Sequence, residues 1–326
     1  MPARVVAPAR LHFGFVNLSP ARERLYGALG VSLDGFRTSV EATPADRVEC
    51  SDPEARRYAE RAVSHLKVPG ATVRVENSPP RHVGLGSGTQ LALATLVAVG
   101  AAYGERPAAR RLAPNLGRGG RSGVGVAAFE GGGFVLDAGH PTGRFTAEPP
   151  ARGEWTVPPI VSRHEIPDDW RFVLALPDAD PGRSGADEDD AMRRTVEDAD
   201  PAVADEIART VVHRVLPAVA EGDARAFGAA VSEIGRLNGA WYADAQGGIY
   251  RPPVGTIVEA LADDPAVDGA GQSSWGPATY AITTADRAER ALDAARRALD
   301  KAGVDGRVEA VAGCNEGAQV ERKHGA

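Results

Sequence analysis

Cysteine is scarce in this chain, because its 326 residues include only Cys50 and Cys314, which lie far apart in the sequence. Two distant cysteines cannot build the disulfide framework of a small secreted fold, so we expect a reducing, cytoplasmic compartment. The first ten residues lack the apolar segment of a signal peptide, and the longest apolar run, 91–102, is too short to cross a bilayer. The sequence therefore predicts no membrane partner.

Excess positive charge is also lacking, because 37 basic residues face 44 acidic ones and give a formal net charge of −7. Nucleic-acid binding needs clustered positive charge, so we expect no nucleic-acid partner. Only Lys67, Lys301 and Lys323 are lysines. The arginine excess suits phosphate or carboxylate binding, although a GC-rich genome also explains it. The sequence lacks His-Glu-x-x-His, Gly-x-Ser-x-Gly and paired Cys/His motifs, so it assigns no metal ligand.

The length predicts about two domains, since one domain commonly takes ~150 residues. We place an N-terminal domain at 1–160 and a C-terminal domain at 161–326, with a Pro- and Gly-rich linker at 141–159. Strands are expected at 4–7, 11–16, 31–41, 71–76, 124–129, 134–137, 171–176, 278–284 and 307–312, and an acidic loop at 177–190. Helices are expected at 54–66, 89–103, 201–221, 224–238 and 285–301, with a kink at Pro217. These elements indicate an α+β fold.

A glycine-rich loop at 80–90 leads into the uncharged apolar segment 89–103, which is typical of a buried helix. Glycines allow close approach of a ligand to the backbone, and the free N–H groups of a first helical turn bind anions. Gly84, Leu85, Gly86, Ser87, Gly88 and Thr89 therefore form a candidate phosphate or pyrophosphate cradle. A plain glycine turn, with Ser87 as the N-cap, is the alternative.

Two familiar nucleotide motifs are excluded at this loop. No lysine follows a glycine, as a Walker loop requires, and Thr89 stands where a dinucleotide fingerprint has its third glycine. The segment 123–128 does match Gly-x-Gly-x-x-Ala, but a Glu-Gly-Gly sequence follows it instead of the helix that the fingerprint requires.

A second loop, at 269–278, offers small donors for an anionic or polar group. Its candidate residues are Gly271, Gln272, Ser273, Ser274 and Trp275. A tight turn between domains is the alternative.

A third segment carries Arg118, Arg121 and Ser122 on a flexible glycine backbone, which suits a multiply charged substrate or a solvated loop. Three histidines, His12, His82 and His140, are candidates for a catalytic base, although His12 and His140 also fit structural roles.

Three segments together resemble the GHMP superfamily: the strand 8–14 (Pro-Ala-Arg-Leu-His-Phe-Gly), the loop with Pro80 and Gly84-Leu85-Gly86-Ser87, and the C-terminal glycine-rich loop. Within it, 84–91, 117–123, 129–132 and Gly271-Gln-Ser-Ser-Trp-Gly-Pro277 resemble the β-ribofuranosylaminobenzene 5′-phosphate synthase family. The kinases of the superfamily differ at Ser87-Gly88-Thr89 and lack the Gln-Ser-Ser-Trp sequence. The resemblance implies a two-domain fold, with a ribosomal S5 domain 2-like N-terminal half and a ferredoxin-like C-terminal half.

The resemblance also implies a reaction. Phosphoribosyl pyrophosphate would condense with 4-aminobenzoate or 4-hydroxybenzoate, releasing CO₂ and pyrophosphate, in the archaeal-type synthesis of tetrahydromethanopterin. The cradle at 84–89 would stabilise the departing pyrophosphate with Mg²⁺, and no organic cofactor is expected. Arg118 and Arg121 would hold the 5′-phosphate or the carboxylate. An ATP-dependent small-molecule kinase and an inactive binding module are the alternatives, and a homodimer is left open.

Overall fold

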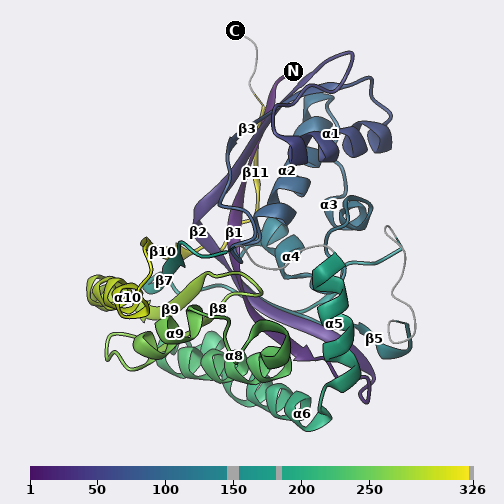
Figure 1. The fold of residues 1–326 in the computed structure, drawn as a ribbon. Coiled ribbons are helices and arrows are strands. Elements are labelled where there is room, and N and C mark those ends of the chain that lie inside the picture. The colour runs from purple at the N-terminus through teal and green to yellow at the C-terminus, as the bar shows by residue number, and fades with distance from the viewer. Residues whose placement is uncertain (145–153, 181–185, 323–326) are drawn as a thin grey trace.

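The computed structural model describes residues 1–144, 154–180 and 186–322 (Figure 1). The described strands are β1 (Ala3–Asn17), β2 (Arg24–Pro44), β3 (Ala71–Asn77), β4 (Phe134–Asp137), β5 (His140–Pro141), β6 (Ile160–His164), β7 (Trp170–Pro177), β8 (Gly269–Gln272), β9 (Thr279–Thr284), β10 (Gly306–Gly313) and β11 (Gln319–Arg322). The described α-helices are α1 (Pro53–Leu66), α2 (Ser87–Ala102), α3 (Ala109–Leu112), α4 (Val124–Gly131), α5 (Ala186–Asp198), α6 (Pro201–Thr210), α7 (Leu216–Glu221), α8 (Ala224–Gln246), α9 (Val254–Ala262) and α10 (Ala288–Ala302). In this part of the chain no helix is both long and apolar enough to span a membrane.

One antiparallel sheet runs through the molecule in the order β11-β1-β2-β10-β7-β9-β8. β3 and β4 also pair with β2, and β6 pairs with β4. The long strands β1 and β2 run from the part of the molecule that carries α1 and α2 to the part that carries α6 and α8 (Figure 1). The predicted boundary at 160/161 stays a prediction, and the sheet continues across it.

The C-terminal half is ferredoxin-like, as the resemblance implied. Its strands follow the sequence β7-β8-β9-β10, with helices after β7 and after β9, and they lie in the order β10-β7-β9-β8. That is the β-α-β-β-α-β arrangement, with the two helical segments as crossovers. The expected helix 201–221 is interrupted by a π-helical turn at Val211–Val215, which ends two residues before Pro217. Proline has no N–H to continue the helical hydrogen-bond ladder.

Local sequence explains why the helices begin and end where they do. Asp52 caps α1 by accepting hydrogen bonds from the backbone N–H groups of Glu54 and Ala55 (3.0 and 2.8 Å). α2 carries no charge and is buried along almost its whole length, as its composition predicted. α10 buries an alanine-rich stripe and ends at Gly303 in a left-handed conformation.

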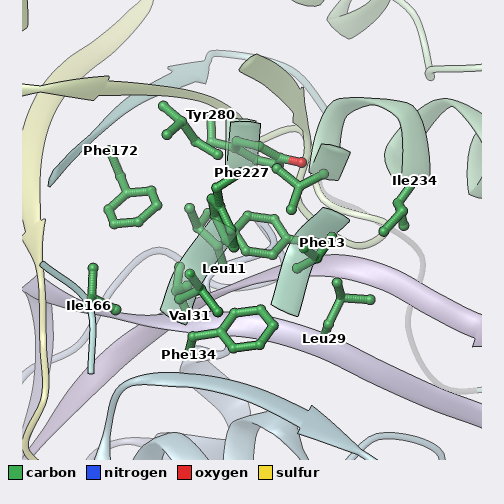
Figure 2. Packing of buried hydrophobic residues seen from close by; sticks show 14 of the residues in the cluster. Leu11, Phe13, Leu29, Val31, Phe134, Ile166, Phe172, Phe227, Ile234 and Tyr280 are labelled. Carbon is green, nitrogen blue, oxygen red and sulfur yellow. The ribbon is translucent and has the colours of Figure 1, made fainter. Parts of the chain in front are cut away.

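The largest hydrophobic cluster joins the two halves of the chain. It contains Leu11, Phe13 and Leu29 from β1 and β2, together with Phe227 from α8 and Tyr280 from β9. Figure 2 shows these side chains packed around the ring of Phe13. The residues on either side of the predicted linker therefore share one core.

The expected strand at 124–129 was wrong, because these residues form helix α4. A short apolar run has no clear period, so its type depends on its surroundings. Here the Asp137 carboxylate accepts a hydrogen bond from the N–H of Gly123 (2.7 Å), the residue that precedes α4, and favours a helix start.

Two expected loops also contain regular structure. Residues 269–272 form the buried strand β8. This strand packs closely on α8, because a Cβ on Gly269 would overlap the backbone of Gly228. Glycine is therefore needed for close helix–strand packing. Helix α5 begins at Ala186 inside the expected loop 177–190, whose residues 181–185 lie outside the described part of the chain. Most of the expected linker, at 145–153, lies outside it too.

Candidate functional site

The glycine-rich loop ends in an open helix N-terminus. Gly86 is the N-cap of α2, has φ +78°, and offers no side chain to the free N–H groups of the first turn. Ser87 is not the cap, because its hydroxyl donates to the carbonyl of Pro80 (3.3 Å). Gly84, Gly86, Gly88 and Thr89 are only partly buried. The turn therefore presents backbone donors and the positive end of a 16-residue helix at an accessible position.

Two arginines flank this turn. Arg10 of β1 donates to the carbonyl of Gly84, and its Cγ would lie 3.0 Å from a Cβ on Gly86. The Nη2 atom of Arg118 would lie 2.8 Å from a Cβ on Gly88. Arg118 also pairs with Glu54 (3.1 Å), which offsets part of its charge. The first turn of α2 is therefore lined by positive charge, with Arg10 on one side and Arg118 on the other.

The second predicted loop packs directly on the first. The Ser273 hydroxyl donates to the carbonyl of Gly84 (2.7 Å) and accepts from the backbone N–H of His12 (3.1 Å). The N–H of Ala278 donates to the carbonyl of Val83 (3.0 Å). A Cβ on Gly84 would overlap the backbone of Ser273, so only glycine allows this approach. Three segments distant in the sequence thus meet at the start of α2.

His12 lies at this junction as a neutral imidazole. Its side chain is buried, and burial followed by the nearby Arg10 charge lowers its pKa to about 3. The Nε2 atom lies 3.2 Å from the hydroxyl of Ser122. Nδ1 is buried without a hydrogen-bond partner among the described residues. His12 can therefore offer a neutral hydrogen-bonding atom, but it is not protonated near pH 7.

A pocket opens beside His12, between β1, α8 and the 272–275 segment. Its cavity volume is about 50 Å³, and it is partly open to solvent. Its lining consists of His12, Phe13, Gly14, Phe15, Gly235, Asn238, Gly239, Tyr242, Gln246, Ile249, Tyr250, Gln272, Ser274 and Trp275. Six of these fourteen residues carry rings, and Trp275 and Tyr242 pack with centroids 4.5 Å apart. Such walls suit a flat, apolar ligand.

The other predicted residues have different surroundings. His82 is exposed, in a left-handed conformation, and does not line this pocket. His140 is buried, and its Nε2 donates to the carbonyl of Gly120 (2.6 Å), which indicates a structural role. Arg121 lies near enough to Tyr26 to lower the pKa of that phenol, although burial raises it more. Gly271 packs under the hydroxyl of Tyr280 and does not line the pocket.

Sequence reasoning did not nominate Arg10, Asn238, Tyr250 or Tyr280. Arg10 lies inside the motif at 8–14, two residues before His12, and this position was the available signal. Asn238 is a buried polar residue on the apolar face of α8. It accepts from the N–H of Phe15 (2.7 Å) and donates to its carbonyl (2.9 Å), which fixes β1 at the pocket. No local signal marks the two tyrosines.

Asp137 holds the backbone beside the site. Its carboxylate is buried and accepts from the N–H groups of Gly123 (2.7 Å) and Gly139 (2.9 Å). Burial raises its pKa from 3.8 to about 6, although these hydrogen bonds oppose the shift. Because the folded pKa exceeds the ordinary value, the folded state binds the proton more tightly. This contribution to stability is therefore lost as the pH rises from about 4 to about 6.

In Asp137→Asn this contribution disappears. Relative to the variant, the wild type should lose up to about 3 kcal/mol of unfolding free energy between pH 4 and pH 7. Denaturant unfolding at several pH values measures the difference, with the exposed Asp46→Asn as the control. The readout is the change of unfolding free energy with pH, because the hydrogen bond that the variant also loses shifts its stability at every pH. Parallel pH profiles for the wild type and Asp137→Asn would contradict the prediction.

The described side chains do not form a ready-made Mg²⁺ site. No group of three or more His, Cys, Asp or Glu residues that could hold a metal lies within the described ranges. Near the start of α1, the carboxylates of Asp52 and Glu54 pair with Arg81 and are not held open for a cation.

Comparison with known proteins shows the class of protein to which the fold belongs. The GHMP kinases N terminal domain matches residues 55–133, and the GHMP kinases C terminal family matches residues 215–301. The fold resembles Streptococcus pneumoniae phosphomevalonate kinase, with TM-score 0.67, 14% identity and coverage of 95% of this chain and 99% of that chain. It also resembles Methanococcus jannaschii mevalonate kinase, with TM-score 0.65, 12% identity and coverage of 96% and 98%. The protein has the GHMP kinase fold.

Closer relatives specify the family. The β-ribofuranosylphenol 5′-phosphate synthase of Methanothermobacter thermautotrophicus is 33% identical over 299 residues, covering 85% of this chain and 87% of the relative. The protein of that name from Archaeoglobus fulgidus is 33% identical over 289 residues, covering 86% and 87%. The one from Methanocaldococcus jannaschii is 28% identical over 329 residues, covering 93% and 95%. This chain belongs to the β-ribofuranosylphenol 5′-phosphate synthase family.

Proposed function

We propose that this enzyme condenses phosphoribosyl pyrophosphate with 4-hydroxybenzoate or 4-aminobenzoate and releases CO₂ and pyrophosphate. One observation carries the proposal: an uncapped helix start, with Arg10 and Arg118 beside it, adjoins a pocket with aromatic side chains in its lining. The Ser273 contact to Gly84 joins the two parts (2.7 Å). A diphosphate sugar and a flat aromatic acid can therefore meet at one junction.

The reaction balances without a redox partner. The ring carbon that carries the carboxylate attacks C1 of the ribose, and the C1–O bond breaks with its electron pair going to pyrophosphate. The bond from the ring to the carboxylate then breaks, CO₂ leaves, and the electron pair restores the aromatic ring. Negative charge grows on the pyrophosphate, where the Ser87 and Gly88 amides and Arg10 are fixed in advance to stabilise it.

The junction residues have positioning roles in this proposal. His12 stays neutral, so its Nδ1 can hydrogen-bond a substrate without adding a second positive charge beside Arg10. Ser122 supports the other ring nitrogen of His12 (3.2 Å). Ser273 fixes the backbone of His12 to the helix start. Arg121 remains a candidate for the 5′-phosphate. We expect Mg²⁺ to enter with the diphosphate, because that ion keeps water and phosphate oxygens as ligands.

Two further points belong to the proposal. The relatives are named for a phenol product, which favours 4-hydroxybenzoate as the first acid to test. We also propose a role in the tetrahydromethanopterin pathway, which the family resemblance supports, and a cytoplasmic location, with which the free thiols of Cys50 and Cys314 agree.

Release of labelled CO₂ tests the proposal. Incubation of the protein with carboxyl-labelled 4-hydroxybenzoate or 4-aminobenzoate should release label only when phosphoribosyl pyrophosphate is present, with pyrophosphate formed in equal amount. Omitting either substrate is the control. Absence of release with both acids would defeat the assignment.

The alternative is an ATP-dependent small-molecule kinase, which the Gly84-Leu85-Gly86-Ser87 loop and the GHMP kinase family matches suggest. Formation of ADP with a panel of alcohols would support it. No ADP formation, together with CO₂ release, would exclude it in favour of the synthase.

A further inference from the structure

The hydroxyl of Tyr280 is buried without a visible partner. Tyr280 lies on β9, is 0% exposed, and packs its ring against Phe13 with centroids 5.1 Å apart. Its hydroxyl has no hydrogen-bond partner among the described residues. An unpaired buried hydroxyl costs free energy that phenylalanine would avoid. The hydroxyl therefore indicates a partner that enters from outside the chain.

The surroundings of this hydroxyl connect it to the pocket. Gly271 pairs with Tyr280 across β8 and β9, and a Cβ there would lie 2.5 Å from the Tyr280 hydroxyl. A Cβ on Gly235 of α8 would lie 3.9 Å from the hydroxyl oxygens of both Tyr280 and Tyr250. Gly235 and Tyr250 line the pocket. In Figure 2 the Tyr280 oxygen points away from Phe172, toward the side where Ile234 lies. Gly235 and Tyr250 thus form the pocket floor, and the Tyr280 hydroxyl is buried behind this floor, outside the pocket lining.

Several other polar groups of the pocket are already committed to the backbone. The Gln272 amide accepts from the N–H of Arg251 (3.2 Å) and donates to the carbonyl of Ser274 (3.1 Å). The Asn238 amide is bound to the backbone of Phe15. Gln246 donates to the carbonyl of Ile249 (2.7 Å). These amides shape the pocket, and the phenols are better placed to recognise a ligand.

We propose that Tyr250 and Tyr280 recognise the polar substituent that the aromatic acid carries opposite its carboxylate. This inference rests on the proposed function, and it assigns the orientation of the ring. The carboxylate end faces His12 and the helix start, while the hydroxyl or amino group reaches the floor under Gly235. Burial raises the pKa of both phenols, so each stays a neutral hydroxyl that can donate and accept.

Calorimetric binding of three acids tests the inference, using the full-length protein in buffer with pyrophosphate, where no turnover occurs. We expect the wild type to bind 4-hydroxybenzoate and 4-aminobenzoate at least about 10-fold more tightly than benzoate, which lacks the substituent. In Tyr280→Phe this preference should fall about 5-fold or more, while benzoate affinity stays unchanged. Tyr103→Phe is the matched control, since the Tyr103 hydroxyl bonds to Gly70 in the N-terminal half (2.7 Å).

The outcomes separate the inference from the proposed function. An undiminished preference in a folded Tyr280→Phe protein would overturn the inference alone, since the wild type would still bind the acids. If that variant does not fold, Tyr250→Phe replaces it, with the same expected loss and the same contrary result. Failure of the wild type to bind any of the three acids would overturn both.

Discussion

Gly86→Val should lower kcat/KM by about 10³-fold or more while leaving the protein folded, since loss of one fixed oxyanion donor commonly costs 10²–10³. Gly86 has φ +78°, where a β-branched residue is strained, and its new Cβ would lie 3.0 Å from Cγ of Arg10. The valine would therefore displace both the donors of the first turn and the neighbouring cation. Initial rates measured by CO₂ release provide the readout.

Gly104→Val is the matched control. Gly104 follows the other end of α2, has φ +84°, and would find no atom within 4 Å of its Cβ. It carries the same kind of backbone strain, of about 1–3 kcal/mol, without touching the site. Both variants should lose similar thermal stability, and only Gly86→Val should lose activity. Comparable rates in the two variants would remove the helix start from the mechanism.

Arg10→Met should lower kcat/KM for phosphoribosyl pyrophosphate by about 10²-fold, with both a higher KM and a lower kcat. The cation would stabilise the diphosphate when it binds and more strongly as charge grows during departure. The fold should be little affected. The Gly84 carbonyl that Arg10 contacts keeps its hydrogen bond from Ser273 (2.7 Å), and methionine preserves the apolar length of the side chain. Steady-state kinetics with varied phosphoribosyl pyrophosphate measures both constants.

Arg4→Met serves as the control for loss of an arginine from the same strand. Arg4 lies on β1 and pairs with Glu76 and Glu321 (2.6 and 3.2 Å) on the surface. Its removal should leave kcat and KM unchanged. Arg10→Lys should recover part of the activity, since lysine keeps the positive charge but lacks the paired N–H donors of the guanidinium group. Full activity in Arg10→Met would show that the diphosphate binds elsewhere.

The sequence predicted the fold wherever composition alone decides the structure. Segment 89–103 lacks charge, so its burial as α2 followed directly. Segment 124–129 was predicted as a strand because a short apolar run is ambiguous, and the hydrogen bond from Gly123 to Asp137 that fixes its helical start is not local. β8 was missed for a similar reason, since Gly269 reflects the close approach of α8, which is distant in the sequence.

The sequence predicted the loops of the candidate site but not the whole lining of its pocket. The loops at 84–89 and 271–275 were nominated, and the structure brings them together through Ser273. The α8 part of the pocket lining was not predicted, because this helix continues past the expected end at 238 and supplies Gly239, Tyr242 and Gln246. A pocket forms where distant elements pack together, and the spacing of residues along one segment does not show which elements those are.

The shared core has a consequence for how substrates are admitted. β10 pairs with β2 on one side and β7 on the other, and the cluster around Phe13 contains residues from both halves of the chain. A hinge rotation that separated the halves would expose that cluster and break the strand pairing. We therefore expect the two proposed substrates to enter, and water to be excluded, through local movements of side chains and short loops at the pocket mouth, while the sheet stays intact.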